Sequence, residues 1–342
     1  MKHILSAICP ILLALSLFLG GCARQDETGA IPVIGTVSPT VSSAEEATSE
    51  NTAHPTPTKE PTDQTKPPEP PSREPVPLQN GYTLGIEQAS ALQAISELFS
   101  SADSANAAVF CYDRDSGAVF CSDTKTQYHT QSTIKAPYIM GVLRLLGNDT
   151  ASALAERLTL RQAEIRNGVG TVKNSPVGTS FTVRELMVGA ITISDNTAYQ
   201  MLYDRFGDEP FNALSESLGL TARLAGSQFC NCSVEEMGRL FCAIWEQDYP
   251  EKEFLLEQLN AAKNNFLISA ALPGYKVAHK YGLATGMGDC HDAAIVFAEH
   301  PYILVIFSKY NPAANEPYAA FRALAKQVDA AHTALWQRDM SE

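Results

Sequence analysis

Short β-strand patterns lie near both ends of the region 81–342, and a long helical block separates them. Strand-forming runs occur at 107–112 and 118–121, and again at 276–283, 293–298 and 302–308. Between about Ser132 and Leu272 the apolar residues recur mostly at helical spacing. Strands so far apart in the chain can pair only if the helical block is an insertion. The pattern predicts one antiparallel sheet with an all-helical lobe alongside, and a site in the cleft between them.

Amphipathic helices are predicted at both ends of this region, and a capping signal marks another inside the block. Apolar residues recur at helical spacing over 86–99 and 321–335. Thr182-Val183-Arg184-Glu185 is a capping box that opens a helix through Ile191. We therefore expect a mixed fold (α/β in the broad sense, α+β in detail). Its five-stranded antiparallel sheet is flanked by N- and C-terminal helices, and its helical lobe is inserted.

The N-terminus has the pattern of an export signal. A short basic start precedes an apolar run over 4–19, and Leu19-Gly20-Gly21-Cys22 closes the segment. This ending resembles the lipobox of bacterial lipoproteins, in which the cysteine is lipidated and becomes the first residue. It implies a signal peptide over 1–21 and a lipid on Cys22 that anchors an exported protein to the outer face of the cell membrane. The alternative is an ordinary secretory signal with an incidental cysteine.

A tether is predicted between this signal and the folded region. Residues 23–80 contain eleven Pro, fourteen Ser or Thr and no Phe, Trp or Tyr. Such a segment buries too little apolar surface to offset the entropy lost on ordering, so the stretch 22–80 is expected to stay unfolded. Residues 81–342 are then the folded domain, held away from a bilayer.

Composition and charge exclude several classes of function. The chain is 45% hydrophobic and 18% charged, which is typical of globular proteins. Its net charge of −13 argues against a nucleic-acid partner, because phosphate binding needs a basic face. It has no Gly-x4-Gly-Lys phosphate loop, and no apolar run after residue 22 is long enough to span a membrane. A nucleotide enzyme of that type, a DNA-binding protein and a multi-span membrane protein are therefore excluded.

The cysteines that follow the tether leave the disulfide state open. An exported protein permits disulfides, but a domain of this size has core enough without them. Cys111 and Cys121 flank a turn, so a cross-strand disulfide is one possibility. The six residues are Cys111, Cys121, Cys230, Cys232, Cys242 and Cys290.

The first of three short motifs carries a serine and a lysine suited to covalent catalysis. Ser132 and Lys135 open a predicted helix, where residues three apart share a face, so the lysine can reach the serine hydroxyl. A desolvated lysine beside a second cation can stay neutral and activate that hydroxyl. Ser122 and Lys125 have the same spacing, but a polar stretch follows them instead of an apolar helix.

The other two motifs lie farther along the chain. Ser194-Asp195-Asn196 stands between two predicted helices, and His279-Lys280-Tyr281-Gly282 stands on the first C-terminal strand. Each has a plainer interpretation. Ser, Asp and Asn are preferred helix caps, and a lysine on a strand can simply face water.

Taken together and in this order, the motifs resemble those of class A β-lactamases and penicillin-binding serine enzymes. The resemblance covers essentially all of residues 82–338. It extends to the residues around Ser194 and to His291-Asp292-Ala293, as in the β-lactamase-type subgroup with a histidine before the strand lysine. It implies the fold described above, a small-molecule β-lactam or a peptidoglycan stem peptide as partner, a monomer, and no cofactor or metal.

The resemblance also implies a role for each site residue. Ser132 is the nucleophile, Lys135 its general base, and Ser194 the relay of a proton to the leaving nitrogen. Lys280 attracts the substrate carboxylate and keeps the pKa of Lys135 low. The substrate-binding residues are Asn196 for the amide, Tyr281, Gly282 and Leu283, with the N–H groups of Ser132 and Leu283 as the oxyanion hole.

Two departures from the family pattern bear on turnover and specificity. Class A enzymes carry a loop Glu that activates the deacylating water, but the corresponding stretch 219–232 contains no acid. Glu235 and Glu236 are the nearest carboxylates, and they have the positions of first-turn helix charges. Tyr281 stands where the family usually has Thr or Ser, whose hydroxyl helps to bind the substrate carboxylate. The tyrosine hydroxyl either donates a hydrogen bond to that carboxylate from farther out or blocks the site.

Two other chemistries compete with this one. A zinc site is the first, because acids, cysteines and histidines gather near the third motif. However, neighbouring strand residues such as Cys290 and His291 point to opposite faces and cannot easily share a ligand sphere. The candidate ligands are His279, Asp289, Cys290, His291 and Asp292, with Cys230 and Cys232 as a second group. A Ser-His-Asp hydrolase is disfavoured because no Gly-x-Ser-x-Gly elbow occurs.

Three hypotheses follow for the function. The first is a β-lactamase-like serine hydrolase acylated at Ser132, active in β-lactam catabolism and the antibiotic response. The second is a D,D-peptidase-like penicillin-binding protein that deacylates slowly. The third is a non-catalytic lipoprotein that binds cell-wall peptides. The complete set of serines and lysines favours catalysis, and the missing loop acid favours slow turnover.

Overall fold

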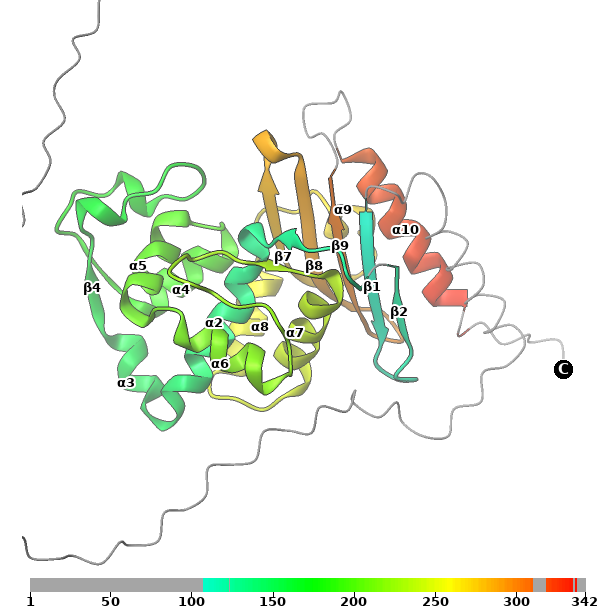
Figure 1. Ribbon diagram of the computed structural model, residues 1–342, viewed down its shortest axis with the longest axis horizontal. Helices are drawn as coiled ribbons and strands as arrows, with labels where there is room; N and C mark the ends of the chain where they lie inside the picture. Colours follow the sequence, from blue (N-terminus) through cyan, green and yellow to red (C-terminus); the bar gives the residue numbers. More distant parts are fainter. Residues whose placement is uncertain (1–106, 123, 310–317, 335, 337–342) are drawn as a thin grey trace, which may run out of the picture. The chain divides into compact units, whose positions relative to one another are not determined.

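The strands from the two ends of the region pair in one antiparallel sheet with the order β2-β1-β9-β8-β7 (Figure 1). The computed structural model describes residues 107–122, 124–309, 318–334 and 336. The sheet contains β1 (Ala107–Asp113), β2 (Val119–Cys121), β7 (Lys276–Ala284), β8 (Asp289–Phe297) and β9 (Tyr302–Ser308). Two short ribbons lie outside it: β3 (Tyr128–His129) with β6 (Asn231–Cys232), and β4 (Arg157–Thr159) with β5 (Ser180–Thr182).

Helices fill the middle of the chain, and one more follows the sheet. They are α2 (Lys135–Leu146), α3 (Thr150–Ala155), α4 (Val183–Thr192), α5 (Asn196–Phe206), α6 (Glu209–Ser217), α7 (Val234–Glu246), α8 (Lys252–Asn260), α9 (Ile268–Ala271) and α10 (Ala319–Ala334). Helix α4 begins where the capping box predicts, because Thr182 Oγ1 accepts the N–H of Glu185 and the Glu185 carboxylate accepts the N–H of Thr182. Among the described residues, none of the helices has the length and apolarity needed to cross a bilayer.

The predicted fold class is confirmed: a five-stranded antiparallel sheet carries an inserted helical lobe and a C-terminal helix. The main difference is β8, which begins at Asp289, four residues before the run predicted at 293–298. Those first residues are polar or cysteine, so they lack a strand pattern, but their side chains are buried and most of their polar atoms have partners within the fold.

Two apolar layers, one on each face of the sheet, hold this architecture together. On one face, α7 packs against β1 and β9, so closely that a Cβ on Gly238 would overlap the ring of Phe110. On the other face, α10 packs against β9, and α9 packs against β7 and α10 (Figure 1). The buried cluster on this face includes Val109 and Cys111 of β1, which alternate along the strand with Phe110. This alternation decides which residues of β7 and β8 face the helical lobe.

The cross-strand disulfide that the cysteine spacing allowed is not formed. In the β1–β2 pairing, Cys121 lies opposite Phe110, and Cys111 lies opposite Phe120. Directly paired residues share a face, so Cys111 and Cys121 point to opposite sides of the sheet. Free thiols are found at Cys111, Cys230, Cys232, Cys242 and Cys290.

A buried carboxylate ties the C-terminal helix to the β1–β2 hairpin. Asp113 is 0% exposed. Its Oδ2 lies 2.6 Å from His332 Nε2 on α10 and accepts from Trp336 Nε1, while its Oδ1 accepts from the backbone and hydroxyl of Ser116. Burial raises the pKa of Asp113, but the bonds from His332 and Ser116 outweigh it, so the net pKa is lowered.

We expect Asp113→Asn to lower the free energy of unfolding at pH 7 by about 1–3 kcal/mol, as for lost bonds to a buried charge. Because the folded-state pKa lies below the unfolded one, this stability is present above the unfolded pKa and is lost as pH falls through the folded pKa. The measurement is urea unfolding of wild type and variant at pH 7 and pH 3. Asp115→Asn is the control, since Asp115 pairs with His300 near the surface, with side chains 42% and 31% exposed. An equal effect of the two substitutions would contradict the prediction.

Several predictions concern residues outside those described. They are the signal peptide over 1–21, the lipid on Cys22, the tether over 22–80 and the helix over 86–99.

Candidate active site

Ser132 lies on a short 3-10 turn, η2 (Gln131–Ile134), that leads directly into α2. The sequence predicts a helix that begins close to Ser132, and the α-helix itself begins at Lys135. Ser132 is half-buried, while Thr133 and the first turn of α2 are buried. The nucleophile candidate thus stands at the boundary between solvent and core, one turn before the candidate base.

The Ser194-Asp195-Asn196 turn caps a helix, which is the plainer interpretation of this motif, and it also contacts two lysines. Asp195 caps α5, because its Oδ1 accepts the N–H groups of Thr197 and Ala198, both at 2.9 Å. Ser194 has the left-handed φ of +58° and is 2% exposed. Such a conformation in a non-glycine residue is strained and is often found at functional sites. In this conformation, Ser194 Oγ lies within hydrogen-bond distance of two lysines.

Lys135 is fully buried and donates its Nζ into this turn. Nζ lies 2.7 Å from Ser194 O, 3.3 Å from Ser194 Oγ and 2.8 Å from Asn196 Oδ1. Within the described structure, Nζ makes no hydrogen bond to Ser132, although the two residues stand one turn apart. The contact that the structure shows is therefore between Lys135 and Ser194, and the predicted reach of the lysine to the Ser132 hydroxyl stays a prediction.

Lys280 reaches the same hydroxyl from the sheet. It lies on β7, the edge strand, and its Nζ donates to Ser194 Oγ and to Tyr281 O, both at 3.0 Å. Lys280 is 1% exposed, so the plainer interpretation, a strand lysine that faces water, is wrong. Ser194 Oγ therefore accepts from two lysines that come from different lobes.

Burial decides the charge of both lysines. Burial lowers the pKa of Lys135 well below its usual value, and the nearby ammonium of Lys280 lowers it further, against the opposing effect of Asp195. Burial also lowers the pKa of Lys280, to about 7, against the opposing charge of Asp292. Neither lysine forms an ion pair with a carboxylate among the described residues. The site can thus hold a neutral amine beside a second amine that binds anions when protonated.

The edge of β7 lies directly against the turn that carries Ser132. A Cβ on Gly282 would lie 2.8 Å from Ser132 N and 3.1 Å from Thr133 N, so only glycine permits this approach. Leu283, the next residue, is half-buried near the end of β7 and pairs with Cys290. The contact brings the backbone of Gly282 close to the N–H of Ser132. The family resemblance implies an oxyanion hole formed by the N–H groups of Ser132 and Leu283.

Asn196 is held on its far side by the segment 166–172. Its N–H donates to Val169 O and its Nδ2 donates to Asn167 O, each at 3.0 Å. The Asp195 carboxylate accepts the N–H groups of Thr171 and Val172 from the same segment, at 2.6 and 2.9 Å. The amide of Asn196 therefore lies between this segment and Lys135.

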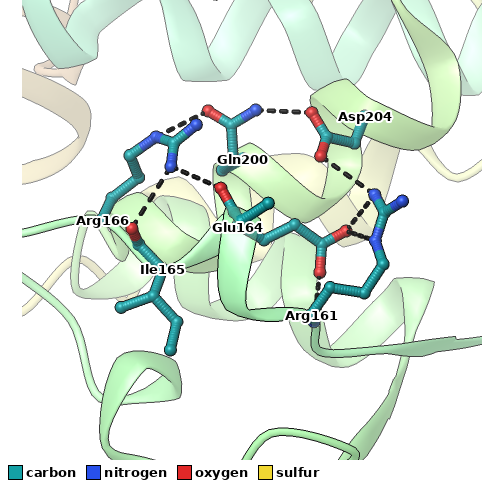
Figure 2. A network of polar contacts seen from close by, with 7 residues as sticks. Arg161, Glu164, Ile165, Arg166, Gln200 and Asp204 are labelled. Carbon is teal, nitrogen blue, oxygen red and sulfur yellow. Dashed lines mark hydrogen bonds and ion pairs between the residues drawn. The ribbon is translucent and has the colours of Figure 1, made fainter.

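A polar network fastens the stretch 161–166, which leads into this segment, to α5 (Figure 2). Its members are Arg161, Glu164, Arg166, Gln200 and Asp204. Arg166 donates Nε to Gln200 Oε1 and its backbone N–H to Thr197 Oγ1, both at 3.0 Å. Thr197 follows Asn196 directly, so the network fixes the outer wall of the site without touching either lysine.

Tyr281 lies beside Lys280, with the lysine Nζ 4.4 Å from the ring centre. The hydroxyl accepts from Asn264 Nδ2 at 2.8 Å, and the ring packs edge-on against Phe266. Burial raises the pKa of Tyr281, and hydrogen bonds with Ser194 and Asn264 only partly offset this. The hydroxyl is thus already engaged by Asn264.

Glu236, one of the two glutamates after the loop, is held by hydrogen bonds and is not placed as a free base. The Glu236 carboxylate accepts from Thr221, Ala222 and Ser233, and it completes the capping box of α7. Burial raises the pKa of Glu236, but these bonds lower it overall. Glu235 stands in the first turn of the same helix. Glu236 is therefore a structural clamp of the loop.

The residues considered as zinc ligands are divided between the two faces of the sheet. His279 Nδ1 lies 3.0 Å from Asp292 Oδ1, and its Nε2 lies 3.0 Å from Asn265 Oδ1, on the face covered by α9. Asp289 and His291 alternate with Cys290 and Asp292 and face the helical lobe. In the described part of the chain, no group of three or more His, Cys, Asp or Glu is placed to hold a metal.

Comparison with known families assigns the chain. A family model named Beta-lactamase2, described as the Beta-lactamase enzyme family, matches residues 90–331. The chain belongs to this β-lactamase family. No curated protein matches it.

Solved structures agree on the fold. PBP-A is 25% identical, with 71% of this chain and 96% of PBP-A covered and a TM-score of 0.61. A mutant of PBP-A, solved as an acyl-enzyme complex with penicillin G, is 24% identical, with 72% and 97% covered and a TM-score of 0.63. A class A β-lactamase from Mycobacterium abscessus is 19% identical, with 71% and 99% covered and a TM-score of 0.62.

Two residues beside Ser132 were not assigned to the site by the sequence. Gln131 has a left-handed φ of +48°, and Asp289 is a buried partner of its side chain. Asp289 appeared only as a candidate zinc ligand, and Gln131 carried no signal. A left-handed non-glycine residue and a contact across 158 positions are both invisible in a single sequence.

Proposed function

We propose that this β-lactamase family member is a serine hydrolase of the class A type that forms an acyl-enzyme at Ser132 with β-lactams or related amides. The observation that carries the proposal is the double donation to Ser194 Oγ by Lys280 and by Lys135, which follows Ser132 by three residues. Two buried amines and a serine hydroxyl between them have little structural purpose, because burying them costs free energy. They suit proton transfer.

The proposed acylation uses these groups in sequence. Neutral Lys135 takes the proton of Ser132 Oγ as that oxygen forms a bond to the carbonyl carbon. The N–H groups of Ser132 and Leu283 stabilise the oxyanion, a contribution of about 3–4 kcal/mol per donor in such chemistry. The C–N bond then breaks, and the proton passes from Lys135 through Ser194 Oγ to the leaving nitrogen. Lys280 binds the substrate carboxylate, Tyr281 borders it, and Asn196 binds the amide.

Deacylation is proposed to be slow. A water must lose a proton to attack the ester, and the segment that packs on Tyr199 beside Lys135 offers Gln228 and Phe229 rather than an acid. Asp195, the carboxylate whose charge acts on Lys135, accepts four backbone N–H groups. This favours the second candidate, a D,D-peptidase-like penicillin-binding protein acting on peptidoglycan stem peptides. The similarity to PBP-A, whose mutant was solved with penicillin G as an acyl-enzyme, supports it.

The deciding experiment is the intact mass of the purified protein over time after mixing with excess penicillin, with Ser132→Ala as the control. We expect an adduct of one penicillin on the wild type and none on the variant. Decay within seconds identifies a β-lactamase, and persistence for hours identifies a penicillin-binding, peptidase-like enzyme. A folded wild type without an adduct would leave the third candidate, a non-catalytic binder of cell-wall peptides.

The pH dependence of acylation follows from the two lysines. We expect kcat/KM, or the second-order acylation rate constant, to increase as the pH is raised from acid values, because Lys135 then loses its proton. It should fall on an alkaline limb near pH 7, where Lys280 loses its proton. Deprotonated Lys280 neither attracts a carboxylate nor depresses the pKa of Lys135, so both effects act in one direction. A rate that stays constant from pH 6 to pH 9 would contradict this account.

Membrane attachment is a further part of the proposal. A lipid on Cys22 would hold an exported monomer on the outer face of the cell membrane, with the stretch 22–80 as its tether. The test is metabolic labelling with a fatty acid and cell fractionation. We expect Cys22→Ser to lose the label and leave the membrane fraction. A wild type without label, released after export, would instead indicate the ordinary secretory signal.

A further inference from the structure

The residue before the nucleophile is held in an unfavourable backbone conformation. Gln131 has a φ of +48°, which is uncommon for a residue with a side chain. Such strain costs on the order of 1–3 kcal/mol and persists only where the surroundings impose it. The contacts that impose it here therefore bear directly on Ser132.

Two contacts and one steric limit hold Gln131. Its side-chain Nε2 donates to Asp289 Oδ2 at 2.7 Å, and its backbone N–H donates to His129 Nδ1 at 3.2 Å. Gly282 presses on it from β7, since a Cβ there would lie 2.8 Å from Gln131 Cβ. Of the two hydrogen bonds, the one to Asp289 is the shorter and joins the turn to the sheet.

Asp289 is built as a rigid anchor. It is 0% exposed and is the first residue of β8, paired with Ala284 beyond the end of the Lys280-to-Leu283 stretch. Its second oxygen forms an ion pair with Lys309, whose side chain is 48% exposed. A hydrogen bond to a buried carboxylate is stronger than one between neutral groups. The amide of Gln131 is thus tied to a fixed point of the sheet.

We propose that Asp289 is a positioning residue for Ser132, which acts by holding the side chain of Gln131. The peptide plane between residues 131 and 132 carries the Ser132 N–H, and the ψ of Gln131 sets the orientation of that plane. Asp289 thereby aims an oxyanion-hole donor toward the same point as the N–H of Leu283. This inference rests on the proposed acylation at Ser132.

The test compares acylation rates of purified variants with their affinity for a boronic acid, which mimics the tetrahedral transition state. Gln131→Met removes the donor at similar size, and Asp289→Ala removes the acceptor. Asp289→Asn keeps an acceptor oxygen for Gln131 and loses only the charge. The double variant, which combines Gln131→Met with Asp289→Ala, tests whether the two residues act together.

We expect Gln131→Met to slow acylation about 10- to 100-fold and to weaken boronate binding by a similar factor, because the oxyanion donor is misaligned. Asp289→Asn should retain the rate within about fivefold of wild type, and the double variant should be no slower than Gln131→Met alone. A merely structural role would lower the melting temperature and leave the rate of the folded protein unchanged.

Two results would overturn the inference. One is a folded Gln131→Met protein that is acylated as fast as wild type. The other is a double variant whose loss of acylation rate equals the product of the losses in Gln131→Met and Asp289→Ala. If Asp289→Ala does not fold, Gln131→Met and Asp289→Asn still decide the question. A wild type that forms no adduct would remove the proposed acylation itself, so the two failures are distinguishable.

Discussion

Replacing Lys135 by methionine is expected to reduce the rate of acylation at Ser132 by about 10³-fold or more. A positioned general base contributes roughly 10²- to 10⁴-fold, and the described structure offers Ser132 no other buried amine in its own turn. Methionine matches the length of the lysine stem but cannot accept a proton. The measurement is the second-order rate of adduct formation with a penicillin, followed by intact mass.

The chain supplies a matched control for this substitution. Lys125 has the same spacing from Ser122 but is exposed, so Lys125→Met should leave the rate unchanged. Melting curves of both variants show whether a loss of rate reflects the folded protein. A Lys135→Met protein that is folded and acylates within tenfold of wild type would exclude Lys135 as the base.

Replacing Gly282 by alanine is expected to slow acylation about 100-fold and to lower the free energy of unfolding by about 1–3 kcal/mol. The added methyl would lie 2.8 Å from both Gln131 Cβ and Ser132 N, so β7 and the η2 turn must separate. Separation moves the N–H of Leu283 away from that of Ser132. The kinetic loss should therefore exceed what partial unfolding explains.

Gly286→Ala is the control for the backbone effect. Gly286 lies in the turn between β7 and β8, and a Cβ there would meet nothing within 4 Å. Its acylation rate and melting temperature should stay at wild-type values. If Gly282→Ala also keeps both values, the close approach of β7 to Ser132 has no role in forming the site.

Local pattern was sufficient wherever the physical cause was local. The capping box at Thr182 placed the start of α4, and the strand-helix-strand order required an inserted lobe. The strand pattern did not predict the start of β8, which lies at Asp289. There, buried polar residues such as Asp289 and Asp292 are stabilised by partners on η2, β7 and α9 rather than by alternation. Burial of polar residues with distant partners leaves no periodic signal.

The cysteines show the same division. Spacing allowed a bond between Cys111 and Cys121, because both flank one turn. The register pairs Cys121 with Phe110 instead, and a shift of one residue along a strand reverses the face of every side chain. Register depends on the fit of the whole sheet, so no single hairpin sequence could decide it.

The sequence by itself determined the order of elements, the family resemblance and the set of chemical groups: Ser132, Lys135, Ser194 and Lys280. The tertiary structure alone decided how these groups act on one another. It buried both lysines against one hydroxyl, which lowers their pKa values, and engaged Glu236 as a clamp. It also tied Gln131 to Asp289. Residue type and spacing specify what a side chain can do, but desolvation and long-range contacts depend on neighbours that only the folded chain brings together.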